Sequence, residues 1–192
     1  MNSNLISRRT MTIGIAAIPA CLGLAAQAWG QSKKATAAAP SAGQGLSHTA
    51  EGIHQEISIN ARRERVYRVL TDSEQFRQVM LLGPAKELVT APGAPPARIS
   101  QAVGGTFTLF GGIITGRQLV LHPNESIVQA WHDSSWRSNE FSIASFVLLE
   151  DGQRTKLMFD HRGFPDGAGA HLAPGWYLNY WDPLAKFLAA AA

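Results

Sequence analysis

The segment 175-GWYLNYWDPL-184 decides the fold of this chain of 192 residues. It lies in a predicted helix from about His171 to Ala191, in which large side chains recur every four residues: Leu172, Trp176, Tyr180, Leu184 and Leu188. A helix that is apolar around most of its circumference must be covered by other structure. Pro183 lies inside the segment and should kink the helix or start its second half.

Five or six strands are predicted before this helix. Their apolar patterns and turn residues place them at roughly 97–103, 105–110, 113–122, 125–132, 139–150 and 153–161. Asp151-Gly152 is the clearest hairpin signal among the turns. Alternation puts Leu157, Phe159 and His161 on one face, which we expect to be concave. A curved antiparallel sheet that is followed in the chain by one helix with large side chains can enclose a cavity.

The folded domain is predicted to span residues 51–192 and to begin with a strand over 53–59. Two short helices should follow, one after Asn60 and one near Asp72, since both residue types are good helix caps. The stretch 84–96 contains four prolines and is predicted to be a loop, with at most a short extended piece.

Several of these segments carry a family resemblance. They are 57-ISINA-61, 66-VYRVLTD-72, 104-GGTF-107, 121-LHPNESIVQAW-131, 161-HRGFP-165, 175-GW-176, 180-YW-181 and 183-PL-184. In this order they resemble the activator of Hsp90 ATPase homologue 1-like family, within the START-like (SRPBCC) superfamily. The resemblance implies an α+β helix-grip fold. In that fold a curved antiparallel sheet surrounds a long C-terminal helix, two short helices follow the first strand, and a cavity lies between sheet and helix.

Residues 1–28 have the layout of a signal peptide. A polar start precedes an apolar run over 11–24, and Ala26-Gln27-Ala28 follows as a small-x-small cleavage site. Ser7-Arg8-Arg9 resembles the twin-arginine export motif. We therefore predict a bacterial protein that is periplasmic or secreted and that meets the membrane only during export.

A flexible linker is predicted over residues 29–50, where Ala, Ser, Gly, Gln, Lys and Pro show no apolar periodicity. Attachment as a lipoprotein through Cys21 is the less favoured alternative to periplasmic release, because Pro19 is unusual in such a cleavage box. Cys21 is the chain's one cysteine, so a mature protein without the signal peptide has no thiol.

Charge and residue spacing argue against nucleic acid, metals and cofactors as partners. The formal charge is +3, but setting aside Arg8 and Arg9 leaves fifteen basic and fourteen acidic residues, with no dense Lys/Arg stripe. The six histidines lack the close paired spacing of a zinc site. We expect no bound metal and no cofactor.

The candidate site residues fall into two groups. His161 could act as a general base together with Asp160 or His132, since all three lie near strand ends. A structural role is the alternative, in which His161 bonds a backbone carbonyl or an aromatic residue of the last helix. The expected lining of an internal cavity is Phe107, Trp131, Phe159, His161, Trp176, Tyr180 and Trp181.

We therefore expect an exported, non-catalytic domain that binds a small apolar or amphipathic molecule. One alternative is an enzyme of the cyclase or dehydratase kind that uses His161 with Asp160 or His132. Another is a co-chaperone-like module with a protein partner, although an exported protein would have neither an ATP-driven chaperone nor ATP at hand.

Overall fold

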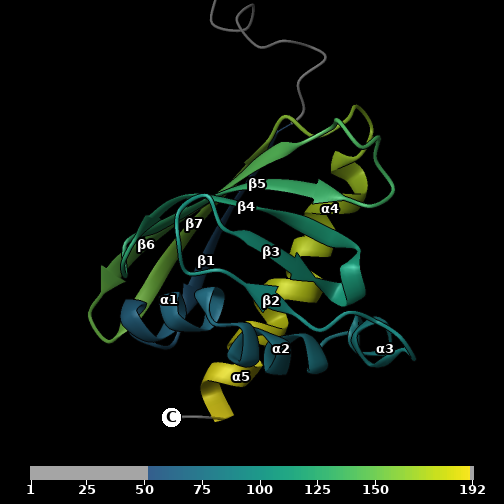
Figure 1. Ribbon diagram of the computed structural model, residues 1–192. Coiled ribbons are helices and arrows are strands. Elements are labelled where there is room, and N and C mark those ends of the chain that lie inside the picture. The colour runs from purple at the N-terminus through teal and green to yellow at the C-terminus, as the bar shows by residue number, and fades with distance from the viewer. Residues whose placement is uncertain (1–51, 191–192) are drawn as a thin grey trace, which may run out of the picture. The chain divides into compact units, whose positions relative to one another are not determined.

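A single antiparallel sheet of seven strands, in the order β1-β7-β6-β5-β4-β3-β2, forms the body of the domain (Figure 1). The computed structural model describes residues 52–190, so the predicted signal peptide and linker lie outside the described residues. The strands are β1 (Gly52–Ile59), β2 (Arg98–Ile99), β3 (Thr106–Leu109), β4 (Ile114–His122), β5 (Ser126–Asp133), β6 (Ser142–Asp151) and β7 (Arg154–Arg162).

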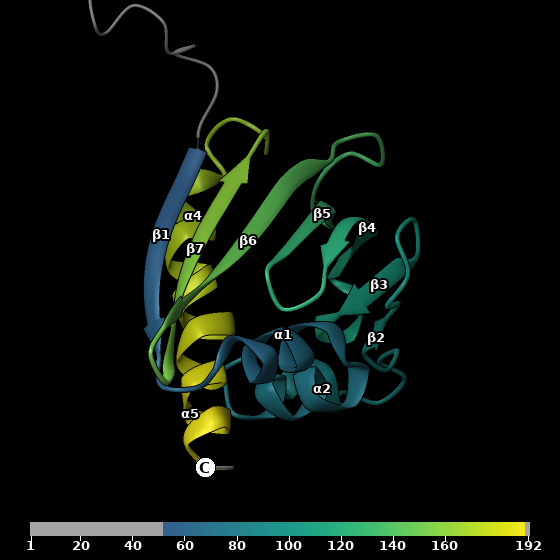
Figure 2. The same cartoon turned by 90° about the vertical axis from the view of Figure 1, so that its left-hand side faces the viewer.

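The helices close the sheet from two sides. They are α1 (Arg63–Thr71), α2 (Ser73–Leu81), α3 (Lys86–Thr90), the 3₁₀ turn η1 (Phe110–Gly112), α4 (Gly169–Trp176), the π-helical turn η2 (Tyr177–Trp181) and α5 (Asp182–Ala190). Helices α4 and α5 run along the concave face, while α1 and α2 lie across its lower end (Figure 2). The predicted helix-grip architecture is confirmed.

Strand alternation sorts the side chains of the sheet into an inner and an outer set. On β7, Leu157, Phe159 and His161 are fully buried, which confirms that these three share the inner face. Phe146 of β6 pairs directly with Phe159, so the two rings lie side by side under the terminal helix. The inner face of β6 and β7 therefore presents an aromatic surface to α4 and η2.

Two sequence-based assignments need correction. The strand predicted over 97–103 is limited to Arg98–Ile99, because Gly104 adopts a φ of +81° and Val103 is left 65% exposed in a turn. The stretch 84–96, predicted to be a loop, contains α3. Pro84 precedes that helix, where a missing N–H costs nothing, and the four residues after Lys86 carry no proline.

The terminal helix changes its hydrogen-bonding pattern just before Pro183, which confirms that this proline starts a second half. The amide of Asp182 donates to the carbonyl of Tyr177, five residues earlier, and Pro183 occupies the first turn of α5. Bonds that span five residues bring side chains five apart onto one side. Trp181 thereby stacks on Trp176, with ring centroids 5.6 Å apart and planes 19° apart.

Candidate functional site

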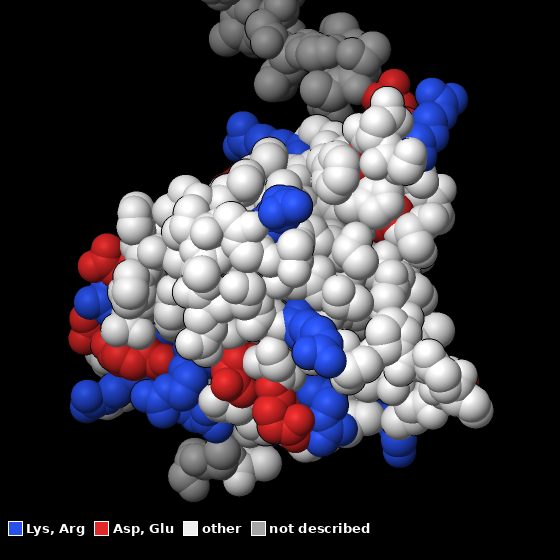
Figure 3. All heavy atoms as spheres, in the orientation of Figure 1, with Lys and Arg blue, Asp and Glu red and all other residues white. Residues whose placement is uncertain are grey.

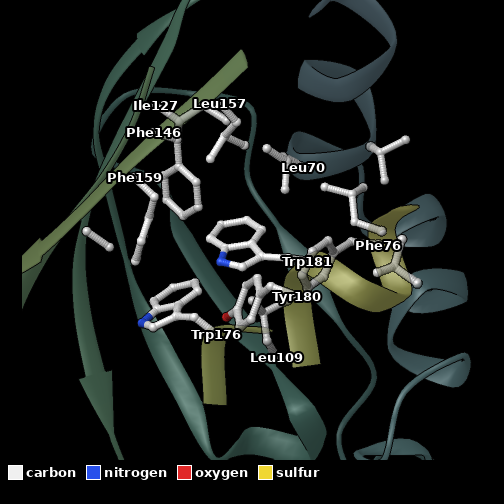
Figure 4. Close-up of a cluster of buried hydrophobic side chains, with 14 of the residues drawn as sticks. Leu70, Phe76, Leu109, Ile127, Phe146, Leu157, Phe159, Trp176, Tyr180 and Trp181 are labelled. Carbon is white, nitrogen blue, oxygen red and sulfur yellow. The ribbon is translucent and has the colours of Figure 1, made fainter. Parts of the chain in front are cut away.

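The space between the sheet and the terminal helix is filled by aromatic rings (Figure 4). Phe159 lies 4.2 Å from Trp176 and 5.2 Å from Trp181, measured between ring centroids. A void beside these rings, bordered by Phe146 and Tyr180, measures about 10 Å³, which is no more than one water molecule occupies. This void therefore has no room for a ligand.

A larger pocket lies to one side of this core, where α3, η1 and the ends of β4 and β5 meet α4 and η2. Its volume is about 250 Å³, and its wall is mainly apolar, with Leu88, Phe110, Ile113, Ile114 and Leu172 beside three of the rings predicted from the sequence. Those three are Trp131, Trp176 and Tyr180. The other four predicted lining residues, Phe107, Phe159, His161 and Trp181, are packed in the core and do not border this pocket.

One wall of the pocket is built from strained backbone. Phe110 has a φ of +52°, a left-handed conformation that costs a bulky residue roughly 1–3 kcal/mol. Its amide donates to the Met80 sulfur at 3.4 Å, and its ring lies 5.2 Å from that of Tyr180. The next residue, Gly111, approaches α3 so closely that a Cβ there would lie 2.5 Å from the Leu88 carbonyl oxygen. Tight packing against α3 therefore holds the strained wall in place.

The buried polar groups of the aromatic residues differ in whether they are satisfied. Trp176 Nε1 donates to His161 Nδ1 at 3.1 Å, and Trp181 Nε1 donates to Gln55 Oε1 at 2.6 Å. Trp131 Nε1 and the Tyr180 hydroxyl are also buried but have no hydrogen-bond partner. An unsatisfied buried group costs roughly 1–3 kcal/mol. Both unsatisfied groups belong to residues that line the pocket.

Burial and a nearby charge keep the Tyr180 hydroxyl neutral. Burial raises the pKa of the Tyr180 hydroxyl well above its usual range, and the nearby Asp133 carboxylate adds to the rise. The neighbouring Trp131 side chain opposes that rise in pKa as a donor toward the hydroxyl, although the two groups do not meet the geometric criteria of a hydrogen bond. Among the described residues that line the pocket there is no Lys or Arg.

His161 is part of a closed hydrogen-bond chain in the core. Its Nδ1 accepts from Trp176, so in the neutral ring the proton lies on Nε2, which donates to Ser142 Oγ at 2.6 Å. Ser142 in turn donates to the Trp131 carbonyl at 3.2 Å. Burial lowers the pKa of His161 to about 4. Both ring nitrogens are occupied by structural partners, so neither is free to take a proton from a ligand.

The structure does not bring together the acid–base pairs considered from the sequence. Asp160 faces the outer side of the sheet, 3.2 Å from His54 Nδ1 and 3.2 Å from Arg162, because neighbouring residues in a strand point to opposite faces. His132, next to the inward-facing Trp131, donates from Nδ1 to the Glu140 carbonyl at 2.8 Å. Neither residue contacts His161.

The pocket has lining residues that the sequence did not single out. Asn179 and Leu88 were missed, as was Phe110. Within residues 52–190 no cluster of three His, Cys, Asp or Glu side chains could hold a metal ion. The same residues contain no helix that is long and apolar enough to cross a membrane.

Residues 60–189 match the family described as Activator of Hsp90 ATPase homolog 1-like protein. An uncharacterized protein of Schizosaccharomyces pombe is 34% identical over 86 residues, which make up 45% of this chain and 25% of that protein. Activator of 90 kDa heat shock protein ATPase homolog 2 of Mus musculus is 24% identical over 107 residues, or 56% of this chain and 32% of its own length. This chain thus spans a quarter to a third of the length of these relatives.

Solved structures share the fold at low sequence identity. The crystal structure of an HSP90 activator from Plasmodium falciparum has a TM-score of 0.60 at 20% identity, covering 73% of this chain and 96% of that one. CalU16 from Micromonospora echinospora has a TM-score of 0.56 at 20% identity, covering 72% and 76%. The match over residues 60–189 and this shared architecture lead to one conclusion: the chain belongs to the Activator of Hsp90 ATPase homolog 1-like family.

Proposed function

We propose that this domain binds a small, largely apolar molecule in the pocket between α3 and α4, without transforming it. The observation that carries the proposal is the apolar pocket of about 250 Å³, one wall of which is strained backbone. Strain of this kind tends to persist where it serves a function. An apolar cavity of ~150 Å³ takes up benzene, and drug-sized ligands need roughly 300 Å³ or more. The expected ligand is therefore slightly larger than one aromatic ring.

The placement of His161 supports the proposal that the domain does not transform its ligand. Its side chain is fully buried, does not border the pocket and is bonded at both nitrogens. Asp160 and His132, the other members of the acid–base pairs, have partners of their own away from the pocket.

Filling the pocket should weaken binding. Gly175 borders the pocket, and a Cβ built on it meets nothing within 4 Å, so a leucine there has room to extend. We expect Gly175→Leu to weaken the binding of acetophenone at least tenfold, a loss of about 1.4 kcal/mol. Ligand-observed NMR titration measures the dissociation constant. Gly175→Ala is the matched control, and it should keep binding because a methyl group occupies little of the volume.

Two results would contradict the proposal of a binding pocket. One is a wild-type protein that takes up neither acetophenone nor its hydrocarbon analogue α-methylstyrene. The other is a folded Gly175→Leu variant with unchanged affinity. Circular dichroism establishes that each variant has the wild-type fold before it is titrated.

We further propose that the protein is exported through the twin-arginine route, as the residues around Arg8-Arg9 indicate. Replacing both arginines by lysine should leave the full-length chain in the bacterial cytoplasm, whereas the wild type should appear in the periplasm cleaved near Ala28. Cell fractionation followed by N-terminal sequencing measures both. A wild-type chain that stays uncleaved in the cytoplasm would refute export.

A protein-binding role is the second candidate, and the outer face of the sheet favours it. Ile143, Val147 and Leu149 on β6 are 43%, 37% and 43% exposed. Over this part of the sheet charged side chains are sparse, while they gather near α1 and α2 (Figure 3). The matched relatives include proteins named as Hsp90 activators. The fractionation experiment separates the candidates, since a cytoplasmic location would place the protein beside such an ATP-driven partner.

A further inference from the structure

We infer that the pocket selects a neutral molecule with a hydrogen-bond-accepting oxygen, such as a ketone, aldehyde, ester or amide, held by the Trp131 indole N–H and the Tyr180 hydroxyl. This inference rests on the proposed binding function and adds the chemical class of the ligand.

The buried polar groups of the aromatic cluster fall into satisfied and unsatisfied ones. The indole N–H groups of Trp176 and Trp181 have acceptors inside the protein, although both rings lie in the same aromatic cluster. Trp131 and Tyr180, only 3% and 6% exposed, have none, and both line the pocket. Buried polar groups in folded proteins are nearly always paired, so two unpaired groups at one pocket indicate a partner supplied by a ligand.

Both unsatisfied groups are hydrogen-bond donors. An indole N–H can only donate, and a neutral tyrosine hydroxyl has one proton to donate. Trp131 is near enough to lower the pKa of the Tyr180 hydroxyl, so a small movement lets its Nε1 donate to the Tyr180 oxygen. The Tyr180 proton would still need an acceptor. Either way the ligand has to supply an oxygen that accepts.

The charged residues that line the pocket disfavour an anionic ligand. The described lining includes Asp133 but no Lys or Arg, and Asp133 Oδ1 is already an acceptor for the amide and hydroxyl of Ser135. His171 borders the pocket with an exposed side chain. An ionised carboxylate would lose its water and lie near another carboxylate, which is costly without a cation. The pocket should therefore reject an anion and accept a neutral carbonyl compound.

Three probes of one shape test this inference on the folded protein. Acetophenone carries the neutral acceptor, α-methylstyrene replaces that oxygen by a CH₂ group, and benzoate carries a full negative charge. We expect acetophenone to bind and benzoate to bind at least tenfold more weakly. A hydrocarbon also enters apolar pockets readily, so binding of α-methylstyrene alone decides nothing. The decisive quantity is the ratio of the affinity for acetophenone to the affinity for α-methylstyrene, compared between wild type and Tyr180→Phe.

Tyr180→Phe keeps the ring and removes the unsatisfied hydroxyl. We expect the variant to lower the affinity for acetophenone about five- to tenfold and to leave that for α-methylstyrene unchanged or higher. Without ligand the variant should melt no lower than wild type, with a rise of about 2–4 °C, since an unsatisfied polar group has been removed. Differential scanning calorimetry measures this shift. Trp131→Phe, which removes the other donor, should shift the affinity ratio in the same direction.

The outcomes separate this inference from the function on which it rests. If both neutral probes bind and Tyr180→Phe leaves the ratio of their affinities unchanged, the acceptor class is wrong while the binding function stands. If benzoate binds as tightly as acetophenone, the neutral class is wrong. If no probe binds wild type, or if Gly175→Leu has no effect on binding, the proposed function fails and this inference fails with it.

Discussion

Replacing Trp181 by alanine should lower the free energy of unfolding by about 3–5 kcal/mol, the usual cost of removing a large buried aromatic side chain. Trp181 is 2% exposed, and its ring packs against Phe146, Phe159 and Trp176 at centroid distances of 6.2, 5.2 and 5.6 Å. Removing the indole leaves a cavity, and the part of it that the neighbouring side chains do not fill adds to the loss of stability. The change also leaves buried Gln55 Oε1 without its indole donor.

Denaturant-induced unfolding measures this loss. Tyr177→Ala is the matched control, because Tyr177 lies in the same π-helical turn but is 44% exposed. The control should change the free energy of unfolding by less than about 0.5 kcal/mol. A loss below about 1 kcal/mol in Trp181→Ala would show that the core is loosely packed and that the ring has room to be replaced.

Acidification between pH 6.5 and 4 should remove about 3 kcal/mol of stability through His161. Burial lowers the pKa of this residue to about 4 in the folded protein, against 6.5 when unfolded. In that interval the unfolded chain binds a proton that the folded chain does not, so stability falls as the pH falls. The contribution is complete above pH 6.5 and is gone below about pH 4. The difference of about two and a half pKa units sets the magnitude.

The carboxylates with a lowered pKa, such as Glu74, lose their contribution to stability mainly at lower pH. A hydrogen bond from Arg77 lowers the pKa of exposed Glu74 to about 2, so its contribution is lost only below its unfolded value of 4.5. Urea unfolding of wild type and His161→Asn at several pH values isolates the histidine. The variant should lose the pH dependence between 6.5 and 4, while His122→Asn, at an exposed turn, should keep it. Identical profiles for wild type and His161→Asn would refute this assignment.

Much of the architecture was predictable because it depends on local patterns. The four-residue spacing from Leu172 to Leu188 predicted the terminal helix, and strand alternation predicted that Phe159 and His161 face inward. The same alternation also places Asp160 on the opposite face from His161. The pairing of those two residues considered from the sequence overlooked that rule, and the structure corrects it.

The candidate site was predictable only in part. The aromatic pattern named Trp131, Trp176 and Tyr180, which border the pocket, together with Trp181 and Phe159, which do not. Aromatic residues give the same sequence pattern whether they fill a core or line a pocket. Whether Trp181 fills the core or borders the pocket depends on the π-helical turn, which brings its ring onto that of Trp176. The residue type alone does not decide it.

The sequence by itself determined the terminal helix, the inner face of the sheet and the family, because these follow from periodicity, turn chemistry and short motifs. Only the tertiary structure decided where space remains and which polar groups lack partners. Those properties arise where α3, Phe110 of η1, Trp131 of β5 and Tyr180 of η2 meet. These residues lie far apart in the chain, and their contacts depend on backbone irregularities that no local pattern encodes.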